Sequence, residues 1–480
     1  MSTDANARPD PSSDRGLREL LDRHAAGSPA AGAGAAQQIL LRGGSVLSMD
    51  RAVGDFAVGD VLIVGDRVAE VGPSISAPEA VVVDARGHIV LPGFCDPHIH
   101  CWEGSLGRII PENVPQTTAD PVAGAPASGR SYMYAAHRLF GPACRPADIY
   151  AGTLNTLLTA LDAGITTVVD NMHNARTPEH SDAAVEALFA AGLRGVHAMG
   201  KPRSGKWAET FPEDAHRLRA QYFHGDDQLC TMRLYAAGSD ELTELLPIRK
   251  ELDLWFSFDS GIERQDLPGL YASGAFDGRE AINHANFLSR QQRQVVVDNG
   301  AQVNVCPRIE SQFRYGRIPY GEWVEQGLRP GLSNDNPMTY GIDMFAEMRA
   351  LYLTQRVDQH RSGEKSASLR EIVQSATQQG ANNCGVGDLV GSLTPGKKAD
   401  IVLLDARKPQ LFPRNNVLCS VVQGADVGCV SAVLVNGRIV KWDGRLLAVD
   451  LAKVQGLVQE SHDYLLDTVH WPHASVDFDD

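Results

Sequence analysis

The sequence predicts an α/β protein in which a (β/α)8 TIM barrel is joined to a small β-sandwich built from both ends of the chain. Short β-branched runs separated by turn residues, typical of antiparallel hairpins, occur near both ends, in "DVLIVGDRVAEVG" and in "VSAVLVNGRIVKWDG". Between them, strand-like runs alternate with amphipathic helices, for example "ITTVVDN" followed by "SDAAVEALFAAGLRG". Such β-then-α units, repeated over about 290 residues, favour a parallel sheet that closes into a barrel.

Five segments follow one another along the chain. Residues 1–36 are mostly small and polar and predict a flexible arm, within which "LRELLDRHAA" could form a short helix. Residues 37–92 predict the first part of the β-sandwich, and residues 93–385 the catalytic barrel. Residues 386–447 return to the hairpin pattern and predict the second part of the sandwich. Residues 448–480 predict a C-terminal helix and tail.

Charge and hydropathy exclude several classes of partner. The chain has 59 acidic and 44 basic residues, a formal net charge of −15, which disfavours binding to nucleic acid or to anionic lipid. No apolar run approaches the roughly 20 residues of a membrane span, and no basic segment followed by a hydrophobic one begins the sequence. The eight cysteines form no Cys-x-x-Cys pair, so we expect reduced thiols and a cytoplasmic protein.

The stretch "LPGFCDPHIHCWEG" carries the clearest candidate site. His98 and His100 follow an apolar run and a Pro-Gly turn, and alternate side chains of a strand point to the same face. Two imidazoles on one face form half of a metal site. Cys95 and Cys101 lie at odd spacings from His98, which places them on the opposite face of an extended strand and makes them poor candidates for ligands.

Seven motifs, in this order along the chain, are similar to those of a known family: "LPGFCDPHIH", "LDAGITTVVDN", "INHANFLS", "GAQVNVCP", "GLRPGLSNDNP", "VGDLVGSLTPGKKADIVLLD" and "VSAVLVNGRIV". Together they resemble the amidohydrolase superfamily, in its cytosine-deaminase-like and chlorohydrolase-like branch. The resemblance implies one divalent ion at the barrel mouth, with His98, His100 and Asp335 of "LSNDNP" among its ligands. It also implies that Asp335 takes a proton from the attacking water and that His284 of "INHANFL" contacts the substrate or that water.

The fifth strand departs from the family pattern. Relatives carry a histidine ligand there, whereas this chain reads "LWFSFDSGIE"; one register places Asp259 at that position and another places Ser257. We prefer Asp259, because carboxylate oxygens bind divalent ions and serine hydroxyls rarely do. A ligand set of two imidazoles and two carboxylates would make the bound ion a weaker Lewis acid. It would also favour manganese or iron, with zinc as an alternative. The departure also leaves open a site without metal.

A second departure bears on the reaction. Ring deaminases of this branch carry a glutamate three residues after the fifth-strand histidine, where this chain has Ile262 or, in the other register, Ser260. Because that general acid is missing, we rank amide or cyclic amide hydrolysis above deamination. Glu263 lies nearby in sequence, and Glu310 of "CPRIES" follows the seventh strand. We suggest Glu310 as a substitute acid, base or ammonium partner, with a structural loop glutamate as the alternative.

Further candidates for substrate contacts follow the early strands. His173 and His197 lie where strands two and three should end, so they could bind substrate, replace the lost ligand or pack in the fold. The connection from Cys101 to Pro146 is long enough to form a lid or a subunit contact. Its candidate contacts are Trp102, Arg108, Tyr132, Tyr134, His137 and Phe140.

The leading hypothesis is a metal-dependent hydrolase that cleaves a carbon–nitrogen bond of a small aromatic or heterocyclic compound, as a homodimer or higher oligomer. Asp335, His284 and Glu310 would carry catalysis, and His173, His197 and Trp102 would contact the substrate. The alternative is a metal-free barrel enzyme that catalyses proton transfer, elimination, isomerisation or decarboxylation. A catalytically inactive binding protein is a third hypothesis, which loss of turnover in Asp335→Asn would exclude.

Overall fold

The computed structural model describes residues 11–26, 36–110, 132–205, 211–225, 228–260, 266–313, 315–363 and 365–472. The chain divides into two compact units. One contains Met1–Gly93 and Asp388–Val449, and the other contains Phe94–Gly387 and Asp450–Asp480. None of the helices in the described part of the chain combines the length and apolar character that a membrane span requires.

The first unit is built on a single nine-stranded sheet that draws strands from both chain ends. Its order is β17-β16-β15-β14-β5-β1-β2-β3, and β4 pairs with β1. The strands are β1 (Gln38–Val46), β2 (Phe56–Val64), β3 (Arg67–Gly72), β4 (Val81–Asp84), β5 (His88–Pro92), β14 (Ile401–Asp405), β15 (Val430–Val435), β16 (Arg438–Trp442) and β17 (Arg445–Leu446). The two ends of the chain meet where β5 pairs antiparallel with β14. Short helical segments α15 (Val417–Cys419), η4 (Ser420–Gly424) and η5 (Val427–Cys429) precede β15.

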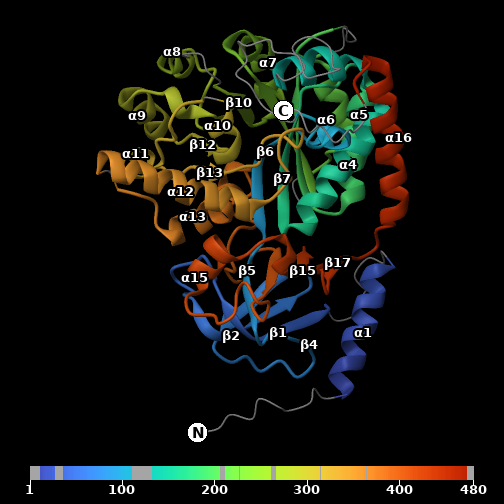
Figure 1. Cartoon of the computed structure of the whole chain (residues 1–480), viewed down its shortest axis with the longest axis vertical. Coiled ribbons are helices and arrows are strands. Elements are labelled where there is room, and N and C mark those ends of the chain that lie inside the picture. Colours follow the sequence, from blue (N-terminus) through green and yellow to red (C-terminus); the bar gives the residue numbers. More distant parts are fainter. Residues whose placement is uncertain are drawn as a thin grey trace. The chain divides into compact units, whose positions relative to one another are not determined.

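Helix α1 (Pro11–Ala25) lies within the segment predicted as an arm and packs on this sheet (Figure 1). Leu20 is fully buried, and Leu17 and Leu21 pack against the same apolar cluster, which includes residues of β1, β14 and β16. Their spacing of three and four residues puts these leucines on one helical face. A hydrogen bond also holds the end of the helix, because the backbone N–H of Ile439 donates to His24 Nδ1 at 3.0 Å.

The second unit is the predicted barrel, and its eight parallel strands confirm the fold class (Figure 1). The strands are β6 (Phe94–Ile99), β7 (Ile165–Met172), β8 (Arg194–Gly200), β9 (Cys230–Ala236), β10 (Phe256–Asp259), β11 (Glu280–Asn283), β12 (Gln302–Val305) and β13 (Gly331–Leu332). Consecutive strands are neighbours from β6 to β13. A parallel bridge between Ile99 and Asp335 joins the first strand to the segment after the last.

Helices surround the strands, as expected for β-then-α units. They are α4 (Pro146–Asp162), α5 (Pro178–Ala191), α6 (Asp214–Gln221), α7 (Ser239–Leu252), α8 (Leu267–Ala272), α9 (Arg290–Asp298), α10 (Pro307–Gln312), α11 (Tyr320–Glu325), α12 (Met344–Ser362), α13 (Leu369–Ala376) and α14 (Gln378–Asn383). Shorter pieces follow β6 and β11: η1 (Cys101–Leu106), α2 (Tyr132–Tyr134), η2 (Ala135–Phe140), α3 (Gly141–Ala143) and η3 (Ala285–Phe287).

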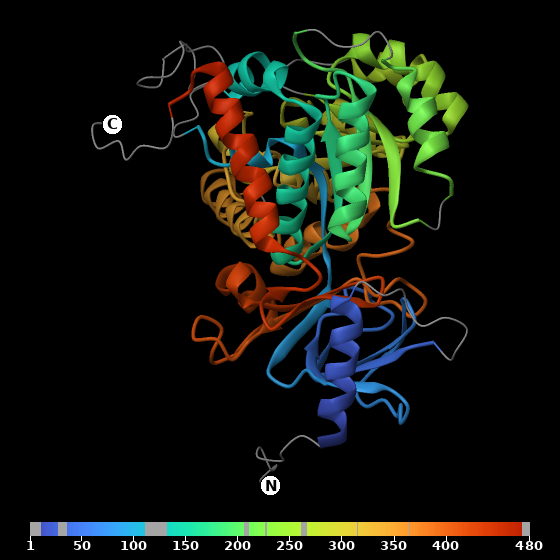
Figure 2. The same ribbon diagram turned by 90° about the vertical axis from the view of Figure 1, so that its right-hand side faces the viewer.

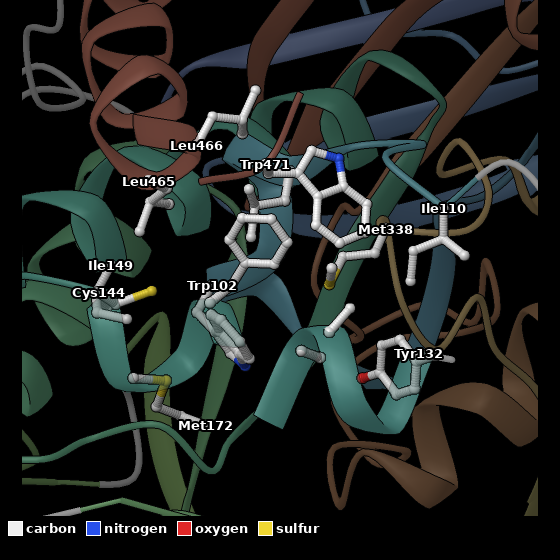
Figure 3. Packing of buried hydrophobic residues seen from close by; sticks show 14 of the residues in the cluster. Trp102, Ile110, Tyr132, Cys144, Ile149, Met172, Met338, Leu465, Leu466 and Trp471 are labelled. Carbon is white, nitrogen blue, oxygen red and sulfur yellow. The ribbon is translucent and has the colours of Figure 1, made fainter. Parts of the chain in front are cut away.

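The C-terminal helix α16 (Leu451–Val469) belongs to the barrel unit and runs beside α4 (Figure 2). Leu465, Leu466 and Trp471 join a buried apolar cluster that also contains Trp102 and Tyr132 (Figure 3). This cluster includes residues from both described parts of the segment predicted as a lid, and residues 111–131 of that segment lie outside the described residues. The helix therefore buries the outer side of the connection that follows the histidine pair.

Candidate active site

Three histidines and one aspartate from widely separated strands converge at one end of the barrel. His98 lies in β6, and the other three follow the last residues of their strands: His100 follows β6, His284 follows β11 and Asp335 follows β13. The Asp335 Oδ1 atom lies 3.5 Å from His98 Nε2 and 3.6 Å from His100 Nε2, and Oδ2 lies 3.5 Å from His284 Nε2. All four side chains are buried. These are the four family positions that the sequence filled.

Backbone pairing holds this convergence in place. The backbone N–H of Asp335 donates to the carbonyl of His98 at 3.0 Å, and that of His100 donates to the carbonyl of Asp335 at 2.8 Å. Asp335 and His284 both adopt left-handed backbone conformations, with φ of 68° and 58°. Such conformations cost about 1 to 3 kcal/mol each and cluster at functional sites.

Asp259, at the end of β10, reaches the same cluster from the fifth strand. Its Oδ1 lies 3.9 Å from His98 Nδ1 and accepts a hydrogen bond of 2.8 Å from Asn283 Nδ2. The hydroxyl of Tyr235 donates to Oδ2. Ser257, the alternative for this position, is fully buried, and its hydroxyl has no hydrogen-bond partner within the described residues. A carboxylate thus stands at the edge of the cluster where the family has an imidazole.

The charges of the cluster support one another. Burial disfavours the ionised form of Asp335, but the adjacent imidazoles of His98, His284 and His100 hold its pKa below the usual value. Burial and the neighbouring His98 lower the pKa of His100 to about 4, which keeps this imidazole neutral. Burial also lowers the pKa of His284, but Glu310 and Asp335 outweigh it and raise that pKa to about 9. A neutral imidazole beside a carboxylate is the form that binds a metal ion.

The donor set fits a divalent cation. His98 Nε2 is buried and has no hydrogen-bond partner in the described structure. Two groups of side chains have ligand atoms within 4.8 Å of one another: His98, His284, Cys306 and Asp335 in one, and His98, His100 and Asp259 in the other. An orphaned imidazole nitrogen among carboxylates is costly unless a cation or water satisfies it.

Asn171, near the end of β7, contacts both histidines of the pair. Its backbone carbonyl lies 2.9 Å from His100 Nδ1, so that nitrogen carries the proton and Nε2 is left as an acceptor. Its side-chain amide lies 2.8 Å from His98 Nδ1. Metal-binding histidines usually have such a partner on the second nitrogen. Asn171 lies two residues before His173, and the shared strand face was the signal that could have identified it.

A cavity of about 280 Å³ opens onto the cluster and is lined by acidic, imidazole and aromatic groups. Its polar lining residues include Asp259, Asp335, His100, His137, His173 and His284. Its aromatic lining residues are Tyr132, Tyr235, Phe313 and Tyr315. The ring of Tyr315 stacks on His284, with centroids 4.7 Å apart and planes 18° apart. The size and lining suit a small flat organic molecule.

Arg203 adds a cation to this lining, and the sequence alone had not indicated it. Its Nη2 donates to the Tyr235 hydroxyl at 2.9 Å, and its Nη1 donates to Glu241 at 2.9 Å. Because Tyr235 in turn donates to Asp259, a chain of hydrogen bonds runs from Arg203 to the fifth-strand carboxylate. This chain orients Asp259 with respect to the histidines.

The substrate candidates separate into two groups. His173 lines the cavity with its ring 4.3 Å from that of His100, whereas Trp102 lies behind it, 5.9 Å away between ring centroids, in the buried apolar cluster. His197 pairs in register with Asp170 and stacks on Phe223. Neither Trp102 nor His197 is among the described residues that line the cavity. The prediction of direct substrate contact by these two therefore does not match the cavity.

Glu310, the residue suggested in place of the missing general acid, lies away from the cavity lining. Glu310 is fully buried and lies behind His284, 3.0 Å from its Nδ1, while its other oxygen accepts from Asn286 at 2.9 Å. It holds the histidine and does not line the cavity within the described residues. The hydroxyl of Ser260 donates to the carbonyls of Asn283 and His284. Ile262 and Glu263 lie outside the described residues.

Comparison with known proteins shows which families the chain is similar to. Residues 251–440 match the model of the amidohydrolase family. The chain is 26% identical over 446 residues to 5-methylthioadenosine/S-adenosylhomocysteine deaminase of Pelotomaculum thermopropionicum, covering 88% of this chain and 97% of the relative. It is 24% identical over 453 residues to 5'-deoxyadenosine deaminase of Methanosarcina mazei, covering 90% and 99%.

Solved structures show the same fold. An adenosine deaminase from Xanthomonas campestris with bound zinc gives a TM-score of 0.76 at 17% identity, over 90% of this chain and 99% of that one. The atrazine chlorohydrolase of Arthrobacter aurescens with zinc gives 0.74 at 22% identity, over 88% and 100%. The chain is therefore similar to the amidohydrolase family over residues 251–440, and to curated deaminases over most of its length.

Proposed function

We propose that the enzyme hydrolyses an amide or cyclic amide bond in a small aromatic or heterocyclic compound. The observation that carries this proposal is the aromatic cavity of about 280 Å³ that opens directly onto the histidine and aspartate cluster. Tyr132, Tyr235, Phe313 and Tyr315 offer ring faces on which a flat substrate would stack. Amide hydrolysis needs a proton for the leaving nitrogen, and it needs no separate acid to protonate a ring nitrogen.

The side chains divide the work around a divalent ion. His98, His100 and Asp335 would hold the ion, which when bound makes water a stronger nucleophile and polarises the scissile carbonyl. Asp335 Oδ2 would accept the proton of the attacking water and return it to the leaving nitrogen. His284, held at Nδ1 by Glu310, would present Nε2–H to the developing oxyanion. The remaining ligand place would fall to the partly buried Asp259 or to the buried Cys306.

The identity of the ion is part of the proposal. The zinc in the two structural neighbours supports zinc, whereas a ligand set with both Asp259 and Asp335 would favour manganese or iron. Metal analysis of protein purified without chelators tests both the presence and the kind of ion. We expect about one ion per chain in wild type and in His224→Ala, an exposed histidine outside the cavity, and loss of the ion in His98→Ala. Full activity of metal-free wild type would instead support the metal-free alternative.

Deamination of a purine ring is the second candidate, because the relatives that span most of the chain are named as adenosine-type deaminases. Two substrate panels separate the candidates: aryl and cyclic amides, followed by ring opening or amine release, and 5'-methylthioadenosine and adenosine, followed by ammonia release. Turnover of amides without ammonia release from the nucleosides is the expected result. Ammonia release from the nucleosides alone would contradict the amide proposal.

A further inference from the structure

We propose that the thiolate of Cys306 is a ligand of the ion, in the coordination place left by the missing fifth-strand imidazole. Cys306 follows β12 directly and precedes α10, at the same end of the barrel as the other candidate ligands. The inference rests on the proposed function, because it concerns the ion that His98, His100 and Asp335 would hold.

The first support is convergence. The ligand atom of Cys306 lies within 4.8 Å of those of two proposed ligands, His98 and Asp335, and of His284, and all four residues are buried. His100 is not in this group and reaches it through Asp335 Oδ1, 3.6 Å from its Nε2. Zinc binds nitrogen and oxygen at about 2.0 to 2.2 Å and sulfur at about 2.3 Å, so ligand atoms around one tetrahedral ion lie roughly 3.4 to 3.8 Å apart. The cluster reaches that spacing with side-chain shifts of about 1 Å. Cys306 is the only one of the eight cysteines that joins such a cluster within the described residues.

The second support is the hydrogen bonding of the two ring nitrogens of His98. Nδ1 is contacted by the amide of Asn171 at 2.8 Å, and Asp259 approaches this same nitrogen, at 3.9 Å. Nε2 has no hydrogen-bond partner among the described residues and faces Asp335 at 3.5 Å. An ion bound to Nε2 therefore lies on the side of Asp335, which belongs to the same group of ligand atoms as Cys306. Asp259 lies toward the occupied nitrogen.

The third support is the state of Asp259. Both of its oxygens already accept hydrogen bonds, one from Asn283 and one from Tyr235, which Arg203 contacts in turn. A carboxylate held in this way is satisfied without an ion. Asp259 would then act on the substrate side of the cavity, as a hydrogen-bond acceptor or a partner for a cationic group.

Coordination of the thiol is a balanced step. The S–H bond of Cys306 breaks, a sulfur–metal bond forms, and the proton is released to solvent, with no change in oxidation state. Without the ion, burial raises the pKa of this thiol well above its ordinary value, so it is neutral and inert. A thiolate ligand also shifts the preference of the site from manganese and iron toward zinc and cobalt.

Cobalt substitution tests the proposal. Wild type loaded with Co²⁺ should show visible bands of a four- or five-coordinate site and a near-ultraviolet sulfur-to-cobalt charge-transfer band. Cys306→Ser should lose the charge-transfer band while the visible bands persist. Cys230→Ser, which alters a buried cysteine on β9 outside both ligand groups, should keep both.

The outcomes separate this inference from the proposed function. Visible cobalt bands without a charge-transfer band in wild type would overturn the thiolate proposal and leave Asp259 as the ligand. Failure of wild type to bind any cobalt or zinc would overturn the proposed function itself. If Cys306→Ser does not fold, X-ray absorption of zinc-loaded wild type gives the same decision. A sulfur neighbour at about 2.3 Å is expected, and a shell of nitrogen and oxygen alone would refute it.

Discussion

Replacing Asn171 with leucine should weaken metal binding while the barrel stays folded. The side-chain amide contacts His98 Nδ1 at 2.8 Å, and its own Oδ1 has no partner within the described residues. Rotation of the amide by 180° would bring Oδ1 to Nδ1, so that Nδ1 carries the proton and Nε2 offers its lone pair to the ion. Leucine removes this partner and leaves a buried ring nitrogen unsatisfied. The bond to His100 persists, because it comes from the backbone carbonyl.

The magnitude follows from one lost buried hydrogen bond. Leaving a buried polar group without a partner costs about 1 to 3 kcal/mol, which corresponds to roughly a 10- to 100-fold loss of metal affinity when the cost falls on a ligand. Competition against a chromophoric chelator measures the affinity, and thermal unfolding with and without zinc measures the stability. Asn171→Asp is the matched control, since a carboxylate accepts from Nδ1 and should keep or strengthen binding. Equal zinc affinity in wild type and Asn171→Leu would refute the reasoning.

Three further predictions concern the carboxylates of Asp335 and Glu310 and the docked N-terminal helix. Asp335→Asn should reduce kcat by roughly 100- to 10,000-fold, because the amide cannot take the proton of water, while circular dichroism stays native. Glu310→Ala removes the buried acceptor that His284 and Asn286 share. It should lower the free energy of unfolding by about 2 to 5 kcal/mol, measured by thermal unfolding, and should lower kcat. Glu310→Gln should recover most of the stability. For His24, burial and the charges of Arg438 and Arg23 lower the folded-state pKa from 6.5 to about 4. The lowered pKa means that the fold favours the neutral His24 ring. The contribution of His24 to the free energy of unfolding is therefore full above pH 6.5 and is lost as the pH falls toward 4. After discounting for partial exposure this is about 1 kcal/mol. Hydrogen exchange of α1 at pH 7 and pH 5 should detect it as lower protection factors at pH 5, once the slower intrinsic exchange in acid is divided out.

Each of these predictions has a result that would contradict it. Near-wild-type turnover of Asp335→Asn would remove the aspartate from proton transfer. Unchanged unfolding of Glu310→Ala would show that the bonds to His284 and Asn286 contribute little. For α1, His24→Gln should abolish the difference between the two pH values, because glutamine does not titrate, and a difference that persists would assign the effect to another group.

Local patterns in the sequence were sufficient to predict the architecture and the histidine pair His98 and His100. The alternation of β-branched and polar residues marks hairpins, and β-then-α units mark a parallel barrel, because both signals depend on neighbours a few residues apart. His98 and His100 were recognisable because strand periodicity puts them on one face. Asp335 and His284 were implied by family motifs. In the structure, Asp335 Oδ1 lies 3.5 Å from His98 Nε2, and Asp335 Oδ2 lies 3.5 Å from His284 Nε2.

Only the tertiary structure decided which side chains face the cavity and which nitrogen of each histidine is free. His197 and His173 occupy comparable strand-end positions in the sequence, yet one stacks on Phe223 and the other lines the cavity. Cys306 carries no sequence signal that separates a ligand from a core residue. Strand periodicity puts Asn171 on one face with His173, but it does not show that Asn171 contacts His98 and His100. Their roles depend on distances between strands up to about 200 positions apart in the chain, which arise only when the barrel closes. Strand register and closure are cooperative properties of the whole sheet, so no local pattern determines them.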